Sequence, residues 1–208
     1  MAEERDSDRP MINSEQFIIE QFHESIAAKM AACEAISEDL ADVADALTDT
    51  LLHQGKVLTL GNGESGIIAK QLSLALTHRL ERERPALPSL CLNHDALTLG
   101  SMVSDGTPEQ IYARQIRGLG EQKDALVIIL QEEATQDIIQ AVRAAHDRQM
   151  LVVLIAGPTL GSLNEQLGEH DIDVLVPVEP SPRLTEIHLL SVSCIVELIE
   201  AQLFGVDS

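Results

Sequence analysis

The chain has 208 residues, enough for one sizeable α/β domain, and 45% of them are apolar although only 2% are aromatic. Aliphatic side chains must therefore form the core, as is usual where helices cover a parallel sheet. A formal net charge of −20 argues against direct binding to nucleic acid, because that affinity comes largely from basic side chains that neutralise phosphates.

Three cysteines, Cys33, Cys91 and Cys194, are scattered through apolar or amphipathic stretches. Their odd number and wide spacing favour buried free thiols in a reducing compartment over a disulfide framework or a zinc site. No basic-then-apolar leader opens the chain, and no apolar run approaches the roughly eighteen residues that a membrane-spanning helix needs. These features predict a cytoplasmic protein without membrane contact.

Residues 1–13 are charged, contain Pro10 and are predicted to form a flexible acidic arm. A helix is expected to begin at Ser14, and Ser37 is expected to cap a second helix that ends at Gly55. The first of these helices carries apolar side chains at spacings of three and four residues, which form one stripe: Phe17, Ile18, Phe22, Ile26 and Met30. Because both helices precede the first strand, we expect their apolar stripes to pack against another subunit.

Strands and helices alternate through the rest of the chain. Strands are expected at 56–60, 89–92, 125–130, 151–156 and 172–176. Helices are expected at about 66–82, 95–103, 108–119, 134–147 and 183–203. This alternation indicates βαβ units and a parallel, doubly wound sheet. We expect residues 14–208 to form a single domain.

Several sequence blocks resemble the phosphoheptose isomerases and their non-catalytic relatives, the DnaA initiator-associating (DiaA) proteins, in the sugar-isomerase (SIS) family. The blocks fall within residues 14–205: VLTLGNGES, RLERERPALPSLCLN, YARQIRGLGEQKDALVIIL, AAHDRQMLVV, RLTEIHLL and QLFG. The resemblance implies an SIS-type α/β fold, a three-layer sandwich with a five-stranded parallel sheet. It also implies a homotetramer in which the two N-terminal helices contribute to a central helical bundle.

The same resemblance implies a zinc site in the active isomerases, and this chain departs from it at every ligand position. The family places a His and a Glu on the first βα helix and a Gln and a His on the last helix. The matching residues here are Gln71, Ala75, Thr185 and Ser193. None of them is an imidazole, thiolate or carboxylate, the strong zinc ligands. The family's general base corresponds to Pro182, so we expect no metal, no other cofactor and no catalytic residue.

The phosphate-binding loop of the family is also altered. A Ser/Thr-rich loop after the third strand holds the substrate phosphate in the isomerases, and the matching stretch here reads LQEEAT at 130–135. Only Thr135 keeps a hydroxyl group. Glu132 and Glu133 would interact favourably with the dipole of the following helix and would repel a dianionic phosphate.

Five residues remain candidates for a residual phosphosugar pocket: Asn62, Gly63, Ser65, Asp105 and Thr135. Ser65 matches a serine that contacts substrate in the family, and Asp105 matches a position near the isomerase site. The alternative is that the GNGES segment and the Ser-Asp-Gly segment are ordinary turns without a ligand.

Three functions are compatible with these residues. The first is a homotetrameric adaptor that binds DnaA and regulates chromosomal replication initiation. Leu203 and Phe204 are its candidate partner contacts, with hydrophobic packing of the last helical turn as the alternative. The second is an isomerase of sedoheptulose 7-phosphate for lipopolysaccharide heptose synthesis, and the third is a sensor that binds a phosphosugar without turnover. The altered metal and phosphate positions favour the first.

Overall fold

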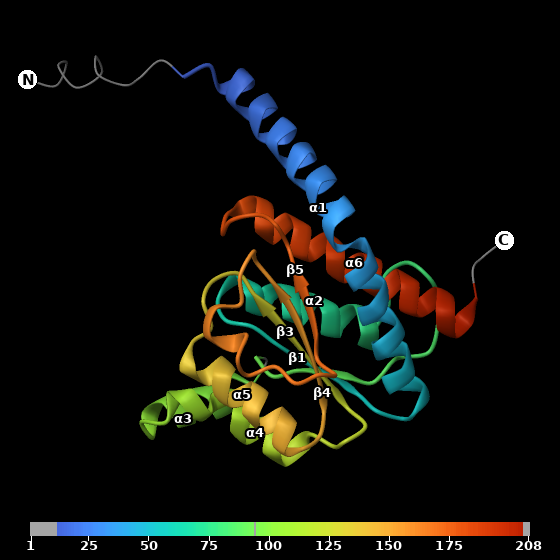
Figure 1. Ribbon diagram of the computed structural model, residues 1–208, viewed down its shortest axis with the longest axis vertical. Coiled ribbons are helices and arrows are strands. Elements are labelled where there is room, and N and C mark those ends of the chain that lie inside the picture. The colour runs from blue at the N-terminus through green and yellow to red at the C-terminus, as the bar shows by residue number, and fades with distance from the viewer. Residues whose placement is uncertain (1–11, 94, 206–208) are drawn as a thin grey trace, which may run out of the picture.

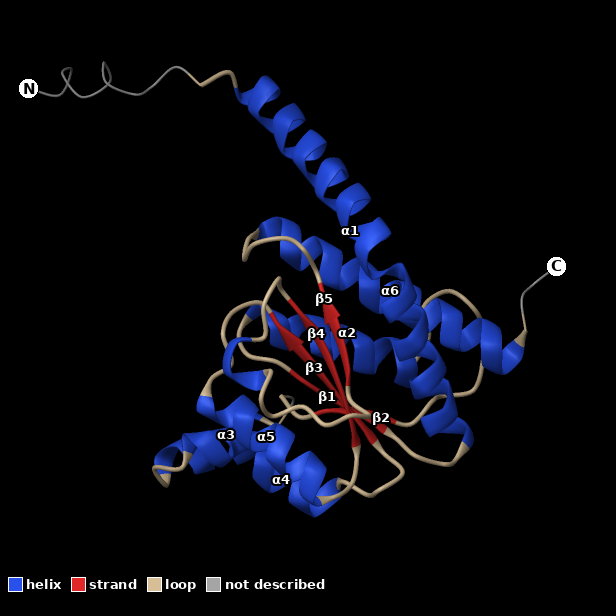
Figure 2. Cartoon of the chain, viewed as in Figure 1, coloured by secondary structure: helices blue, strands red, loops and turns tan. Residues whose placement is uncertain are grey.

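Five parallel strands form one sheet in the order β2-β1-β3-β4-β5 (Figure 2). The strands are β1 (Val57–Leu60), β2 (Ser89–Cys91), β3 (Ala125–Leu130), β4 (Leu151–Ala156) and β5 (Ile172–Leu175). The five strands and the SIS-type α/β architecture predicted from the sequence are confirmed, with strand ends shifted by at most one residue. The computed structural model describes residues 12–93 and 95–205, so most of the predicted N-terminal arm lies outside the described residues.

Helices cover both faces of the sheet and give three layers (Figure 1). One face carries α1 (Ser14–Leu52), α2 (Glu64–Thr77) and α6 (Pro182–Phe204). The other carries α4 (Ile111–Leu119) and α5 (Gln136–Asp147), with α3 (Ala96–Ser104) and the short 3-10 helix η1 (Pro108–Gln110) beside them. A second 3-10 helix, η2 (Gly161–Leu163), lies between β4 and β5.

The strand side chains alternate between two separate apolar cores. In β3, Val127 and Ile129 face the α1–α2–α6 layer, whereas Leu126 and Ile128 face the α4–α5 layer. All six residues of β3 are buried, as its continuous apolar run predicts for a central strand of a parallel sheet.

The prediction of two N-terminal helices is wrong, because α1 is a single helix of 39 residues. Asn13 caps its start by accepting a hydrogen bond from the backbone of Gln16 at 3.2 Å. Ser37, the expected cap of a second helix, instead donates its hydroxyl to the carbonyl of Cys33 one turn earlier. A hydroxyl can serve either role, and no proline or glycine between residues 14 and 52 interrupts the helix.

The C-terminal helix α6 is long and apolar enough to cross a membrane by length and composition, with a mean hydropathy of 1.6 over eighteen residues. This stretch does not contradict the sequence observation, because α6 contains Glu186, Glu197 and Glu200 and is not a continuous apolar run. In the structure this helix packs against α1 and α2 as part of the core, and 44% of the stretch is buried. The predicted burial of the cysteines also needs correction: none of the three forms a disulfide, but only Cys91 is buried, while Cys33 and Cys194 are exposed.

A buried ion pair fastens α6 to the end of α2. Arg84 donates to Glu200 at 2.8 Å, and both side chains are almost completely buried. The same guanidinium donates to the carbonyls of Ala75 and Leu76 at 2.7 and 2.8 Å. It thereby satisfies acceptors in the last turn of α2, where backbone carbonyls lack partners within the helix.

Candidate functional site

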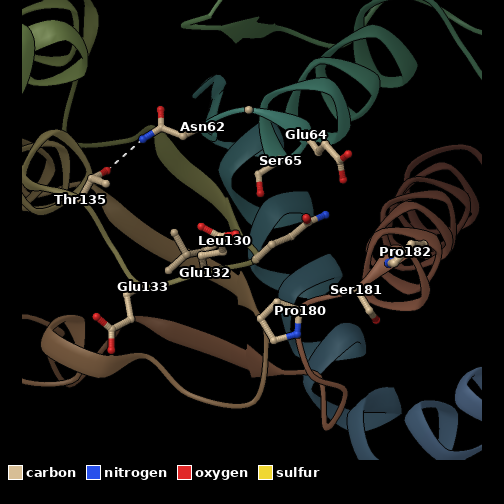
Figure 3. A pocket seen from close by; sticks show the side chains of 12 residues that line it. Asn62, Glu64, Ser65, Leu130, Glu132, Glu133, Thr135, Pro180, Ser181 and Pro182 are labelled. Carbon is tan, nitrogen blue, oxygen red and sulfur yellow. Dashed lines mark hydrogen bonds between the residues drawn. The ribbon is translucent and has the colours of Figure 1, made fainter.

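A pocket of about 480 Å³ opens at the carboxyl edge of the sheet, where the chain leaves β1 and β3 (Figure 3). Its lining residues come from the β1–α2 turn, the β3–α5 loop and the start of α6: Asn62, Gly63, Glu64, Ser65, Leu130, Gln131, Glu132, Glu133, Thr135, Pro180, Ser181 and Pro182. The order of the strands reverses between β1 and β3. Ligands of open α/β sheets bind at such a reversal, so the topology itself singles out this pocket.

The first wall of the pocket is the tight turn between β1 and α2. A Cβ on Gly61 would lie 2.7 Å from the backbone carbon of Ser65 and 2.9 Å from the carbonyl oxygen of Ile129, so only glycine fits there. Gly63 precedes α2 with φ of +54°, a conformation that favours glycine. Gly61 and Gly63 therefore shape the tight connection between strand and helix, which the sequence allowed as the alternative to ligand binding. This connection places Ser65 in the first turn of α2.

Asn62 is held by a polar network that joins both sides of the sheet's switch point. Its amide nitrogen donates to the hydroxyl of Thr135 and to a carboxylate oxygen of Asp137, both at 2.9 Å. The buried hydroxyl of Tyr112 donates to its amide oxygen at 2.7 Å. Burial raises the pKa of Tyr112 to about 12, which keeps this donor protonated. Asn62 and Thr135 are therefore bonded to each other, and Asn62 is also bonded to Tyr112 and Asp137. Neither Tyr112 nor Asp137 is among the site residues predicted from the sequence.

A second polar chain crosses the pocket toward α6. Gln131 donates to the hydroxyl of Thr185 at 2.8 Å, and that hydroxyl donates to a carboxylate oxygen of Glu64 at 3.3 Å. Thr185 is one of the positions at which the resemblance expects a zinc ligand. Its oxygen already has two protein partners here, which fix the β3–α5 loop and α2 to the start of α6.

The residues at the four expected zinc positions do not fit a zinc ion. Ala75 has no donor atom and is buried, and Ser193 donates its hydroxyl to the carbonyl of Leu189 within α6. Among the described residues, no group of three or more His, Cys, Asp or Glu side chains could hold a metal. His188 on α6 is fully buried, and burial lowers its pKa to about 4. It is a neutral residue of the core.

The β3–α5 loop makes the pocket acidic. Glu132 and Glu133 follow β3 after Gln131, Glu64 lies across the pocket, and the lining contains no Lys, Arg or His. In Figure 3 the Glu133 carboxylate points away from the centre of the pocket, and Glu132 and Glu133 are both exposed. Thr135 precedes α5 but makes no side-chain cap bond to that helix. A cradle for phosphate combines basic or hydroxyl side chains with free backbone N–H groups, and this loop has one hydroxyl, Thr135, no basic side chain and two carboxylates that would repel the anion.

Ser65 differs from the other polar residues of the pocket. The residue is 4% exposed, and its hydroxyl has no hydrogen-bond partner among the described residues. In Figure 3 it points from the first turn of α2 into the pocket. Of the predicted ligand contacts that line this pocket, Ser65 is thus the one whose side-chain polar group has no protein partner among the described residues.

The remaining predicted contacts lie elsewhere. Asp105 ends α3 and lines a separate surface depression with Thr98 and Arg114, so the structure does not bring it to this pocket. Leu203 and Phe204 lie in the last turn of α6 and are partly buried against the α1–α2–α6 core. Arg82 donates to the carbonyl of Phe204 at 3.0 Å. The pair therefore packs on the protein, and part of each side chain stays accessible.

Comparison with known proteins points to a single family. The SIS domain model matches residues 21–157. A phosphoheptose isomerase of Alkalilimnicola ehrlichii is 37% identical over 93% of this chain and 99% of its own length. A DnaA initiator-associating protein DiaA of Edwardsiella ictaluri is 38% identical over 88% and 93%. The solved phosphoheptose isomerase of Francisella tularensis superposes with a TM-score of 0.85 at 34% identity, covering 90% of this chain and 98% of its own.

Proposed function

We propose that this chain, which belongs to the SIS-domain family, is a non-catalytic cytoplasmic adaptor that forms a homotetramer and binds the replication initiator DnaA. The observation that carries the proposal is the chemistry of the pocket. Threonine, glutamine, alanine and serine stand where the isomerases need zinc ligands, and carboxylates stand where they need a phosphate cradle. Proton transfer between sugar carbons needs a positioned acid and base, and Pro182 stands at the base position.

The oligomer is supported by the exposed apolar stripe of α1. Phe17, Ile18, Phe22, Ile26 and Met30 are each more than half exposed. A second copy of the chain is the occupant that best fits this stripe, because the resemblance places the N-terminal helical segment in an intersubunit bundle. A tetramer also gains avidity for a partner that is present in several copies at one site.

The pairing with DnaA is supported by relatives named DnaA initiator-associating protein, which match 88% of the chain at 37–38% identity. Relatives named phosphoheptose isomerase match equally well. The isomerase of sedoheptulose 7-phosphate is therefore the second candidate function, and the two must be separated by experiment.

The test is made on one purified preparation of the full chain. We expect elemental analysis to show no stoichiometric zinc and assays to show no turnover of sedoheptulose 7-phosphate, while the protein captures purified DnaA. Phe204→Ala should weaken this capture. Leu97→Ala, which removes an 84% exposed leucine from α3, is the matched control and should not. Thermal unfolding of both variants separates a lost contact from a lost fold. Zinc together with turnover would instead establish the isomerase.

A further inference from the structure

The pocket at the switch point has the charge and hydrogen-bonding groups for a ligand of a different class from a sugar phosphate. We propose that it binds a small polyhydroxylated ligand carrying a protonated amine, an amino sugar without a phosphate group. Three glutamates line the pocket and no basic side chain does, while hydroxyl and amide groups line the remainder. A volume of about 480 Å³ lies within the range of roughly 300–1,000 Å³ usual for small-molecule sites.

The helix dipoles do not reverse the sign of this charge. The positive ends of α2 and α5 both face the switch point, and each is equivalent to about half an elementary charge. Each already has a full negative charge in its first turn, Glu64 on α2 and Asp137 on α5. Glu132 and Glu133 are added to these without a basic counterpart on the lining. The balance therefore favours a cation and disfavours a dianionic phosphate.

Ser65 gives independent evidence that the pocket receives a ligand. A hydroxyl that lines a pocket without a protein partner takes its hydrogen bonds from solvent or from a bound ligand. The Ser65 hydroxyl has none among the described residues and points into the pocket. A ligand hydroxyl would supply that partner, and Ser181 lines the pocket nearby as a second neutral group.

An organic cation fits these carboxylates better than a metal ion. Ca²⁺ and Zn²⁺ need oxygen or nitrogen atoms converging on one point at about 2.0–2.6 Å. Glu64 is drawn toward Thr185, and Glu133 points away from the centre of the pocket (Figure 3). No metal-holding group of carboxylates forms among the described residues. An ammonium group on a sugar ring interacts with such spread charges through separate hydrogen bonds and through the field of the pocket.

The test compares three sugars with the same ring on the full chain at equal ionic strength. Glucosamine, below the pKa of its amine, should raise the unfolding temperature with increasing concentration, because a ligand that binds only the folded state stabilises it. N-acetylglucosamine, which replaces the cation by a neutral amide, should bind at least tenfold more weakly, since charge-assisted hydrogen bonds are the stronger kind. Glucose 6-phosphate and inorganic phosphate should give no stabilisation.

Two variants and a matched control locate the binding. Glu132→Gln should weaken glucosamine binding about tenfold and largely remove the preference over N-acetylglucosamine, because it removes a charge from the lining of the pocket. Ser65→Ala should weaken both sugars alike. Glu165→Gln removes an exposed carboxylate beyond η2, outside the pocket lining, and should change neither affinity.

Other outcomes overturn the proposal. Stabilisation by glucose 6-phosphate or phosphate without stabilisation by glucosamine would show that the pocket binds anions and not an amine. Equal effects of Glu132→Gln and Glu165→Gln would show only nonspecific attraction to an acidic protein. No response to any sugar would also contradict it. None of these results bears on the capture of DnaA or on the oligomer, so the two proposals fail separately.

Discussion

The two halves of α1 carry similar apolar stripes but have different surroundings. In the C-terminal half, Val43, Ala44 and Leu47 are completely buried against the core formed with α2 and α6. In the N-terminal half, Phe22 and Met30 are each 68% exposed, and Figure 1 shows this part of the helix projecting beyond the sheet and its covering helices. The same apolar spacing thus packs into the core of this chain in one half of α1 and forms an exposed apolar surface in the other half.

Leu47→Ala should give the largest loss of stability. Its side chain is fully buried in the core, so truncation loses transfer free energy and leaves a cavity, at a cost of about 2–5 kcal/mol. Met30→Ala on the projecting half is the control and should cost far less in the dissociated chain. Urea unfolding followed by circular dichroism measures both. Equal losses would contradict the division of α1 into two halves.

The division of α1 also shows what the sequence could and could not predict. The spacing of Phe17, Phe22 and Met30 correctly predicted an apolar stripe on a helix. The sequence also correctly predicted that this stripe does not cover the sheet. The break at Ser37 was not real, because the same hydroxyl that caps a helix can bond back to the carbonyl four residues earlier. Whether the segment forms one helix or two depends on its packing against α6, and a local sequence pattern does not contain that information.

The pocket shows the same limit. Residues that follow β1 and β3 meet because carboxyl ends of neighbouring parallel strands meet, so Asn62 and Thr135 were placed together correctly. Asp105 was wrongly placed with them, because the position of the loop after the edge strand β2 depends on how α3 packs. The bonds of Thr185 to Gln131 and Glu64 depend on where α6 begins relative to the sheet. That is a tertiary property without a sequence signature.

The second-largest effect is expected on acidification, which should lower the free energy of unfolding through His188, a residue on the core-facing side of α6. The pKa of His188 is about 4 in the folded chain and 6.5 in the unfolded one, so the unfolded chain binds more protons between these values. Its contribution is complete above pH 6.5 and is lost as the pH falls toward 4, by about 3 kcal/mol in total. The free energy of unfolding, measured across this range for wild type and His188→Leu, should fall less steeply in the variant. Parallel curves would contradict the buried neutral histidine.

A smaller effect is expected where the projecting half of α1 meets α6. Glu186 accepts hydrogen bonds from Lys29 at 2.7 Å and from Ser25, and these bonds lower the pKa of its carboxyl group. A lowered carboxyl pKa contributes stability above its ordinary value of 4.5 that is lost as the pH falls through the folded-state value. Because the pair is partly exposed, Glu186→Gln should cost at most about 1 kcal/mol.

That cost should also be local. Hydrogen exchange of backbone amides near Ser25 and Lys29 should speed up in Glu186→Gln, while amides near Leu47 should keep their protection. Protection of a segment reflects its own opening free energy, and the two halves of α1 are held by different contacts. Uniform acceleration along the helix would mean that α1 opens as one unit.

Phe22→Asp should change the stability of the single chain least and its assembly most. Phe22 is 68% exposed, so replacing it in the dissociated chain should alter the free energy of unfolding by no more than about 0.5 kcal/mol. A charge in an apolar intersubunit contact has no partner there and opposes association. Sedimentation should therefore show a tetramer for wild type and smaller species for the variant, with Glu24→Ala on the opposite side of the same turn as control. A wild type that stays monomeric at every concentration would mean that the projecting half of α1 serves another partner, and the apolar stripe would then have to be explained without a second copy of the chain.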